Sequence, residues 1–247
     1  MPKLRKKKKE KRATRFTQAP TKIEDKVFDY DTLLTLNKLI KSEYLTRVNG
    51  PISVGKEANV FLGYLGEEPR AVKIYRIETT SFNNMMPYIA GDPRFNVKKD
   101  KRQFIYTWAK KEFRNLRRAY KAGASVPRPY VSMKNIVVME CIGGEVPAKT
   151  LKNTVVEDPS AVYEQVVENM AKLQQTGLVH SDLSEYNILM DGERAVLIDM
   201  AQAVVLEHPN SKEFLERDAQ NIARCMSKLG VRTSKKEVLN RVTSPSQ

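Results

Sequence analysis

The stretch HSDLSEYN, residues 180–187, places acidic and amide side chains between two apolar runs. In this stretch Asp182 and Asn187 lie five residues apart, and Asp199 follows 12 residues later, after the apolar run AVLI. Carboxylate and amide oxygens are the ligands that Mg²⁺ prefers, and a carboxylate without a strong cation beside it can accept a hydroxyl proton. Each of these residues alone could simply cap a turn. Together, H-x-D-L-x-x-x-N and an Asp at the end of a strand are typical of phosphoryl-transfer sites.

A lysine upstream fits the same chemistry. Lys73 lies in AVKIY, where apolar residues flank it on both sides. An unpaired ammonium in such a strand would be costly, so we expect an anionic partner, either a phosphate or a helix Glu. Glu112, in the next predicted long helix, is the candidate for that partner. The alternative is that Glu112 faces solvent beside Lys110 and Lys111.

A candidate phosphate-binding loop precedes Lys73. The sequence SVGKEANV, residues 53–60, lies between two predicted strands but holds only Gly55, where a protein-kinase loop has three glycines. By composition alone this motif is weak, and its position before the Lys73 strand strengthens it. We expect Ser53, Gly55 and Lys56 to contact phosphates.

The elements that must position these residues can be predicted from apolar periodicity and capping residues. A helix is predicted over residues 31–45, with Asp31 as its cap and Leu33, Leu36 and Ile40 on one face. Three strands of an antiparallel meander are predicted within residues 52–77. Residues 78–98 hold two prolines and show no sustained period, so a long mobile loop is expected there.

The second part of the chain is predicted to be mainly helical. Helices are expected over residues 101–123, with Glu112 on or near the apolar face, over 158–177, and over a last helix, 211–230. Short strands are expected at 130–133, 136–141, 188–190 and 195–198. The fold class is therefore α+β, with a β-rich half followed by a helical half and no internal repeat.

Three motifs together resemble one known family. Gly-Lys-Glu-Ala in the phosphate loop, His-Ser-Asp-Leu-Ser-Glu-Tyr-Asn at 180–187 and Ile-Asp-Met-Ala-Gln at 198–202 are similar to the RIO family of atypical serine/threonine protein kinases. The resemblance covers about residues 30–230 and is closest to the branch named for the first RIO kinase, in a compact archaeal-like form. It implies a two-lobed, protein-kinase-like fold. Its parts would be a basic disordered arm (1–28), a nucleotide-binding lobe with an N-terminal helix (29–142) and a truncated helical catalytic lobe (143–247).

The resemblance also implies roles for individual residues. The chain would be a kinase and ATPase that takes ATP as substrate with Mg²⁺ or Mn²⁺ as cofactor. Lys73 would contact phosphates, Asp182 would be the catalytic aspartate, and Asn187 and Asp199 would hold the metal. The hinge that hydrogen-bonds adenine would consist of Met139, Glu140, Cys141 and Ile142.

The sequence departs from ordinary protein kinases around Asp199. Asp199-Met200-Ala201 replaces Asp-Phe-Gly, Ser181 replaces the catalytic-loop arginine, and only 48 residues follow Asp199. Activation by loop phosphorylation is therefore not expected. Because little chain remains to hold a peptide substrate, Asp199 is itself a candidate phosphoacceptor; the alternative is that it only binds metal.

Charge and cysteine content suggest partners and compartment. The chain carries a net charge of +14, and residues 1–15 contain nine Lys or Arg against one Glu. A polyanion is expected to bind, and the resemblance points to preribosomal RNA or a small-subunit particle; the alternative is a solubilising tail. Two isolated cysteines and the lack of a long apolar run favour a cytoplasmic protein without a membrane segment or secretion signal.

Two other function classes remain open from sequence. One is another compact kinase-like phosphotransferase, either of the type in the tRNA-modifying KEOPS complex or one acting on small molecules. Its loop usually reads His-Gly-Asp, and Ser181 argues against it. The other is a nucleotide-binding RNA scaffold without catalysis, against which the intact set of Lys73, Asp182, Asn187 and Asp199 argues.

Overall fold

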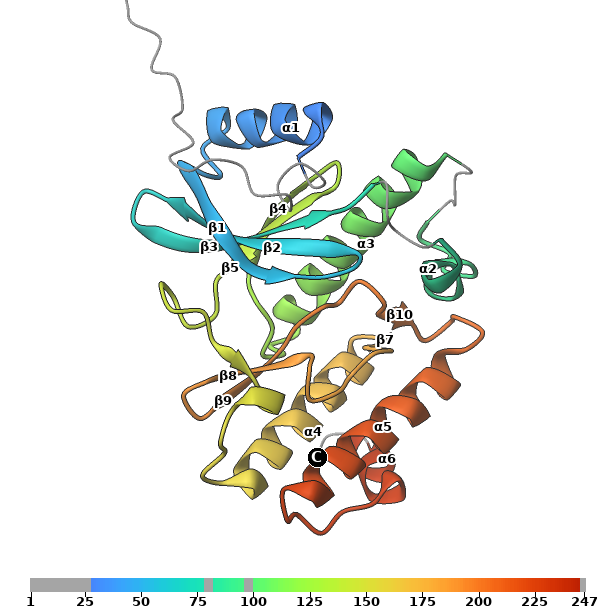
Figure 1. Cartoon of the computed structure of the whole chain (residues 1–247). Coiled ribbons are helices and arrows are strands. Elements are labelled where there is room, and N and C mark those ends of the chain that lie inside the picture. The colour runs from blue at the N-terminus through green and yellow to red at the C-terminus, as the bar shows by residue number, and fades with distance from the viewer. Residues whose placement is uncertain (1–27, 78–81, 96–99, 245–247) are drawn as a thin grey trace, which may run out of the picture.

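A computed structural model describes residues 28–77, 82–95 and 100–244 of the chain. Figure 1 shows a β-rich upper part and a mainly helical lower part, joined by the chain that leaves strand β5. The predicted arm, residues 1–28, lies outside the described residues except for Phe28. The two-lobed α+β architecture predicted from the sequence is confirmed.

The upper part is built on one antiparallel sheet with the strand order β1-β2-β3-β5-β4. Its strands are β1 (Arg47–Val54), β2 (Ala58–Leu65), β3 (Glu68–Tyr75), β4 (Pro129–Met133) and β5 (Ile136–Glu140). Alternate side chains of a strand face opposite sides of the sheet. Phe61, Val72 and Val138 form a buried cluster with Leu36 and Leu39 of the first helix. Lys73 and its neighbours in register therefore face the other side, toward the lower part.

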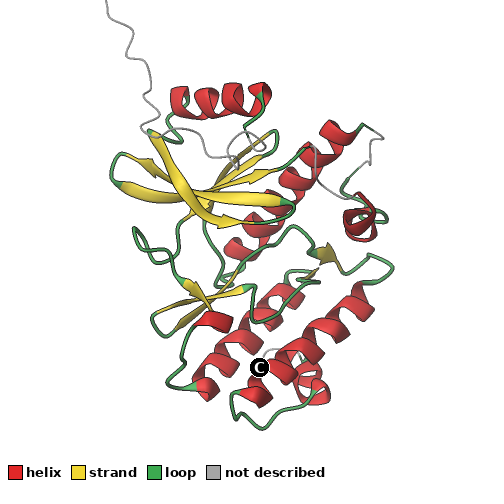
Figure 2. Cartoon of the chain, in the orientation of Figure 1, coloured by secondary structure: helices red, strands yellow, loops and turns green. Residues whose placement is uncertain are grey.

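Helix α1 (Tyr30–Lys41) covers the outer face of this sheet, as Figure 2 shows. Its cap is Asp29, whose carboxylate accepts from Thr32 N, so the predicted cap at Asp31 is wrong. Asp31 instead pairs with Arg102. The predicted face is confirmed only in part. Leu36 is buried and Ile40 packs half-buried against the same cluster, whereas the other fully buried positions are Thr32, Thr35 and Leu39.

The segment predicted as a loop contains helix α2 (Phe82–Ile89), so that prediction is wrong for its central part. Met85 and Ile89, one turn apart, are buried in the main core. Pro87 lies inside the helix, and an internal proline argues against a helix when only the residue pattern is considered. The helix forms because tertiary packing outweighs a poor local propensity. The predicted mobility of residues 78–81 and 96–99 falls outside the described residues.

Helix α3 (Lys101–Lys121) crosses the boundary between the two parts and agrees with its prediction. Asp100 caps its N-terminus, and Gly123, with φ +74°, follows its end in the left-handed conformation. All of the expected face is buried: Ile105, Trp108, Glu112, Leu116 and Ala119.

The lower part consists of three helices and short strand pairs. Helix α4 (Pro159–Gln175) follows its cap Asp158 and buries one apolar face: Val162, Tyr163, Val166, Val167, Met170 and Leu173. On the apolar stripe of α5 (Ser211–Lys228), Ala219, Ile222 and Met226 are buried, while Leu215 and Leu229 at its two ends are half-buried. The remaining elements are β6 (Lys149–Thr150), the 3-10 helix η2 (Leu151–Asn153), β7 (Leu178–Val179), β8 (Ile188–Asp191), β9 (Arg194–Leu197), β10 (Val204–Val205) and α6 (Lys235–Thr243).

Helix α6 was not predicted, since 211–230 was expected to be the last helix. It is nine residues long, and only Val238 and Val242 are buried, which leaves a weak periodic signal. Among the described residues, no helix is both long and apolar enough to cross a membrane.

Candidate active site

Lys73 lies at the centre of a buried ion-pair network. Its Nζ donates to Glu112 Oε1 at 2.7 Å and to Asp199 Oδ1 at 2.9 Å. Tyr75, two residues along the strand, donates its hydroxyl to Glu112 Oε2 at 2.6 Å. The expected contact between Lys73 and Glu112 is therefore confirmed, and a solvent-facing Glu112 is excluded because that residue is 1% exposed.

The charges of this network depend on one another. Burial alone would lower the pKa of Lys73, but the two carboxylates outweigh it and raise that pKa above its ordinary value. Burial would likewise raise the pKa of Asp199, and the adjacent ammonium lowers it instead. Asp199 is therefore ionised at neutral pH. Its side chain is 39% exposed, so a ligand can still reach the carboxylate beside Lys73.

Side chains of helix α5 hold the backbone of the loop that carries Asp182. The carboxylate of Asp218, which is 1% exposed, accepts from Ser181 N at 2.7 Å and Leu183 N at 2.9 Å. Arg217 donates to the carbonyl of Ser181. These contacts stabilise Ser181 in the left-handed region, at φ +70°, which non-glycine residues rarely adopt. The backbone on both sides of Asp182 is therefore fixed.

Asp182 and Asn187 contact each other across this loop. The Nδ2 atom of Asn187 donates to the backbone oxygen of Asp182 at 2.8 Å and to its Oδ2 at 3.1 Å. Burial, followed by the charge of Asp199, raises the pKa of Asp182 to about 6. Asp182 thus has the partly buried, electronegative surroundings that suit a proton acceptor.

Of the residues predicted to contact phosphates, Gly55 and Lys56 lie in the loop between β1 and β2, and Ser53 lies in β1 just before it. Gly55 N donates to Ala58 O at 3.0 Å, and Asn59 Oδ1 also accepts from it at 3.3 Å. A Cβ added at Gly55 would lie 2.8 Å from Ala58 O, so a side chain would not fit this turn. Ser53 and Lys56 are exposed there.

Glu57 is a site residue that sequence reasoning did not single out. Burial, then the charge of Asp199, raises its pKa, and Asp182 adds to the effect. Glu57 therefore faces the same space as these two carboxylates. Its position in the Gly-Lys-Glu-Ala motif was the available signal, but a glutamate in a glycine-poor loop has no general chemical signature.

The register of the sheet shows which residues lie beside Lys73. Val60 and Val137 lie opposite Lys73, while Leu62 and Met139 lie opposite Ala71 two residues earlier. These residues share the inner face of the sheet with Lys73; Val137 and Met139 are buried there, and Val60 and Leu62 are half-buried. Of the predicted hinge, Met139 and Glu140 are the last residues of β5, and Cys141 and Ile142 follow it. Ile142 O accepts from Ala148 N at 2.9 Å, which shapes this connection.

The donor set suits a divalent cation bound together with a nucleotide. Among the described residues, no three His, Cys, Asp or Glu side chains converge as a metal site. Both amide hydrogen bonds of Asn187 run through Nδ2 to Asp182, which leaves its carbonyl oxygen as an acceptor. Asn187 and Asp199 could therefore supply two oxygen ligands, with phosphate oxygens completing the shell.

The chain is similar to a known family, to individual proteins and to solved structures. Residues 59–239 match the RIO domain family. The chain is 45% identical over 212 residues to the RIO-type serine/threonine-protein kinase Rio1 of Haloferax volcanii, covering 85% of this chain and 73% of that protein. The Rio1 of Methanocaldococcus jannaschii is 40% identical over 225 residues, with 90% and 77% covered.

The chain is also similar to a solved kinase structure that contains bound ligands. The crystal structure of the Rio2 kinase-ADP/Mg²⁺-phosphoaspartate complex from Chaetomium thermophilum matches with a TM-score of 0.66 and 25% identity, covering 86% of this chain and 66% of that one.

Proposed function

The chain belongs to the RIO family of serine/threonine-protein kinases, and from this premise we propose that it transfers the γ-phosphate of ATP with the residues described above. The observation that carries the proposal is the convergence of Lys73, Glu112 and Asp199 from three distant parts of the chain onto one point. The pKa of Asp182 responds to the charges of Asp199 and Lys73, and Asn187 contacts Asp182 directly. This convergence supports a single site around Lys73.

The roles follow from charge and position. Lys73 would turn from Asp199 toward nucleotide phosphates, while Glu112 keeps its ammonium in place. Adenine would lie against the apolar inner face of the sheet, with the hinge 139–142 supplying backbone hydrogen bonds. Asp182 would accept the proton of the attacking hydroxyl. A Mg²⁺ held by Asn187 and Asp199 would neutralise phosphate charge when bound.

The test is turnover of γ-labelled ATP by single variants. Lys73→Met, Asp182→Asn and Asn187→Ala should each lose at least about 100-fold in kcat/KM while remaining folded. Asp191→Asn is the matched control, since Asp191 lies four residues from Asn187 but pairs outward with Arg194, and it should retain turnover. Wild-type rates in Asp182→Asn would overturn the proposal.

We also propose Asp199 as a phosphoacceptor beside protein serine. An oxygen of its carboxylate would attack the γ-phosphorus, the bond to the β–γ bridging oxygen would break, and ADP would leave. Water would then hydrolyse the resulting acyl phosphate to restore the carboxylate and release phosphate. The ionised, partly exposed carboxylate supports this step. So does the phosphoaspartate in the Rio2 complex.

Hydroxylamine distinguishes the two acceptors because it cleaves acyl phosphates and leaves serine phosphates intact. After brief labelling, hydroxylamine should release label from wild type, and Asp199→Asn should carry none that is releasable. Label that entirely resists hydroxylamine would leave serine as the only acceptor.

For the partner, we propose RNA of a small ribosomal subunit particle. The support is the excess of Lys and Arg in residues 1–15 and the positive charge of the remaining chain. Deleting residues 1–15 should flatten the dependence of RNA affinity on salt and leave basal ATP hydrolysis unchanged. If RNA affinity depends equally on salt in the full chain and in the deleted form, residues 1–15 do not contact the RNA.

A further inference from the structure

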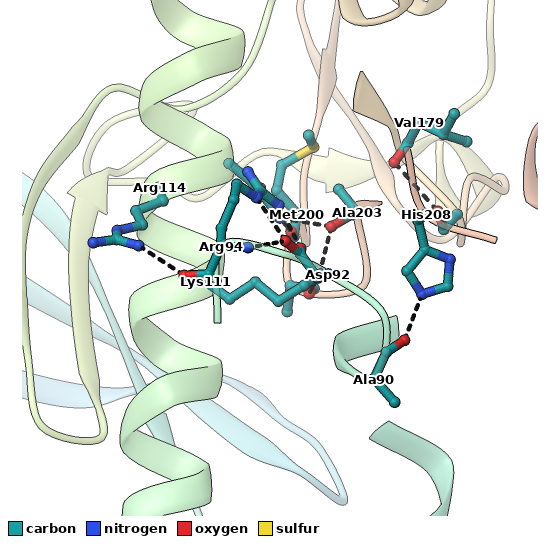
Figure 3. A network of polar contacts seen from close by, with 12 residues as sticks. Ala90, Asp92, Arg94, Lys111, Arg114, Val179, Met200, Ala203 and His208 are labelled. Carbon is teal, nitrogen blue, oxygen red and sulfur yellow. Dashed lines mark hydrogen bonds and ion pairs between the residues drawn. The ribbon is translucent and has the colours of Figure 1, made fainter. Parts of the chain in front are cut away.

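Helix α3 carries two buried polar residues beside Glu112 that the proposed chemistry does not use. Lys111 is 0% exposed and donates to the carbonyl oxygens of Ala201, at 2.8 Å, and of Ala203. Asn115, also 0% exposed, donates to Met200 O at 2.9 Å and to Ala203 O at 2.8 Å. We call these four hydrogen bonds the α3 anchor. Figure 3 shows Lys111 reaching toward this backbone.

Lys111 and Asn115 would be costly to bury if they only filled space in the core. Within the described parts of the chain, Lys111 forms no salt bridge, and its two hydrogen bonds go to neutral carbonyls. Asn115 Oδ1 is buried and finds no partner among the described residues. Apolar side chains of similar size would avoid both desolvation penalties. What Lys111 and Asn115 provide instead is a set of directed donors to one backbone segment.

That segment begins immediately after Asp199. Residues 200, 201 and 203 supply the acceptors, and Asp199 itself has φ +61°, a conformation that the following backbone must maintain. Because Lys111, Glu112 and Asn115 lie on one rigid helix, the anchor closes a ring. The ring runs from α3 through residues 200–203 to Asp199, then to Lys73, and returns to α3 at Glu112.

Segment 90–95 covers the anchor from outside. Asp92, 2% exposed, receives two side-chain hydrogen bonds from Arg94, at 2.9 and 2.7 Å. Arg114 donates to Arg94 O at 3.4 Å, and His208 Nε2 lies 2.9 Å from Ala90 O. Figure 3 places Asp92 beside Lys111 and His208 beside Ala90. The segment is thereby held to both α3 and the loop before α5.

We propose that Lys111 and Asn115 are positioning residues that hold α3 and the backbone after Asp199 in one arrangement, so that Lys73, Glu112 and Asp199 are aligned before nucleotide binds. The consequence for turnover rests on the proposed kinase function; the structural consequence does not. In this chain, an outward movement of α3 would have to break the anchor as well as the Lys73–Glu112 pair. Alignment thus needs no phosphorylated loop.

The first test is hydrogen exchange of the nucleotide-free protein. Lys111→Met and Asn115→Leu should each raise the exchange rates of amides in residues 199–206 by about ten-fold or more, because Ala203 N, Leu206 N and the β7–β10 pair then lose a fixed backbone. Exchange in α4 and α6 should stay at the wild-type level. Lys110→Met is the matched control, since Lys110 is the exposed neighbour on the same helix.

The second test is steady-state turnover of the same variants. Loss of alignment should lower kcat by about ten-fold or more while KM for ATP changes by less than about three-fold. Exchange at 199–206 that matches wild type in both variants overturns the proposal, as does a rise of equal size throughout α4 and α6, which would indicate general destabilisation. If wild type itself shows no phosphoryl transfer, the kinase proposal fails while the exchange result still decides whether the anchor holds this segment.

Discussion

Replacing Glu112 with Gln tests the ion-pair network most directly. The substitution keeps the size of the side chain and a hydrogen-bonding group for Tyr75 but removes the charge that faces Lys73 at 2.7 Å. Breaking a buried ion pair by removing one partner typically costs about 3–5 kcal/mol. Here Lys73 keeps Asp199 at 2.9 Å, so we expect a loss of about 2–3 kcal/mol in the free energy of unfolding.

Urea unfolding followed by circular dichroism measures this change, provided that the slope with denaturant stays the same. The control is Glu168→Gln, whose ion pair with Lys172 has a 64% exposed carboxylate, and it should change stability by less than about 0.5 kcal/mol. A double-mutant cycle with Lys73→Met should give a coupling of about 2 kcal/mol. Glu112→Gln should also lower kcat/KM by about ten-fold or more, because Lys73 is no longer held toward the phosphates.

A Glu112→Gln protein that unfolds within about 0.5 kcal/mol of wild type and turns over ATP at the wild-type rate would contradict this prediction. That result would mean that Asp199 alone satisfies the ammonium. A stable but inactive variant would instead limit the role of Glu112 to positioning.

Three further predictions concern single residues. Burial lowers the pKa of Lys111 to about 7, whereas a lysine in the unfolded chain titrates at about 10.4. Between these two values the unfolded chain binds more protons than the folded protein, so the free energy of unfolding should rise with pH from about 7 to 10. Lys111→Met should reduce that rise, which is measured by comparing urea midpoints at about pH 7 and 9.5. Asp218→Asn replaces one of the two carboxylate oxygens that accept from the backbone N–H groups of Ser181 and Leu183 with a donor. It should destabilise the protein by about 1–3 kcal/mol and speed hydrogen exchange at residues 181–183; unchanged exchange there would contradict the assigned role. Gly55→Ala sets a Cβ against Ala58 O, so nucleotide affinity measured by calorimetry should fall several-fold while the unfolding midpoint stays near wild type; unaltered affinity would show that the turn adapts.

Local patterns were sufficient to predict the elements whose own residues determine them. Helix α4 has an Asp cap, a proline at its start and a continuous apolar face, and all of these behave as the sequence indicates. The same holds for α3, whose periodicity also placed Glu112 toward the interior. Predictions failed where the local signal was weak or ambiguous. Either of two nearby aspartates could have been the cap of α1, and an internal proline argued against α2. Helix α6 buries only two residues and therefore has a weak apolar pattern.

The candidate site divides in the same way. The sequence determined which side chains are available for phosphoryl transfer, because their types and short spacings are fixed along the chain: Lys73 within an apolar strand, Asp182 five residues before Asn187, and Asp199 beyond the next hairpin. Only the tertiary structure decided which of them meet. Asp199 contacts Lys73 across 126 residues of sequence, and Lys111 donates to backbone carbonyls 90 and 92 residues away. Apolar periodicity indicates which face of an element is buried but not what lies against it. Because every residue carries the same backbone carbonyl, the sequence does not show which carbonyl accepts a hydrogen bond from a distant side chain.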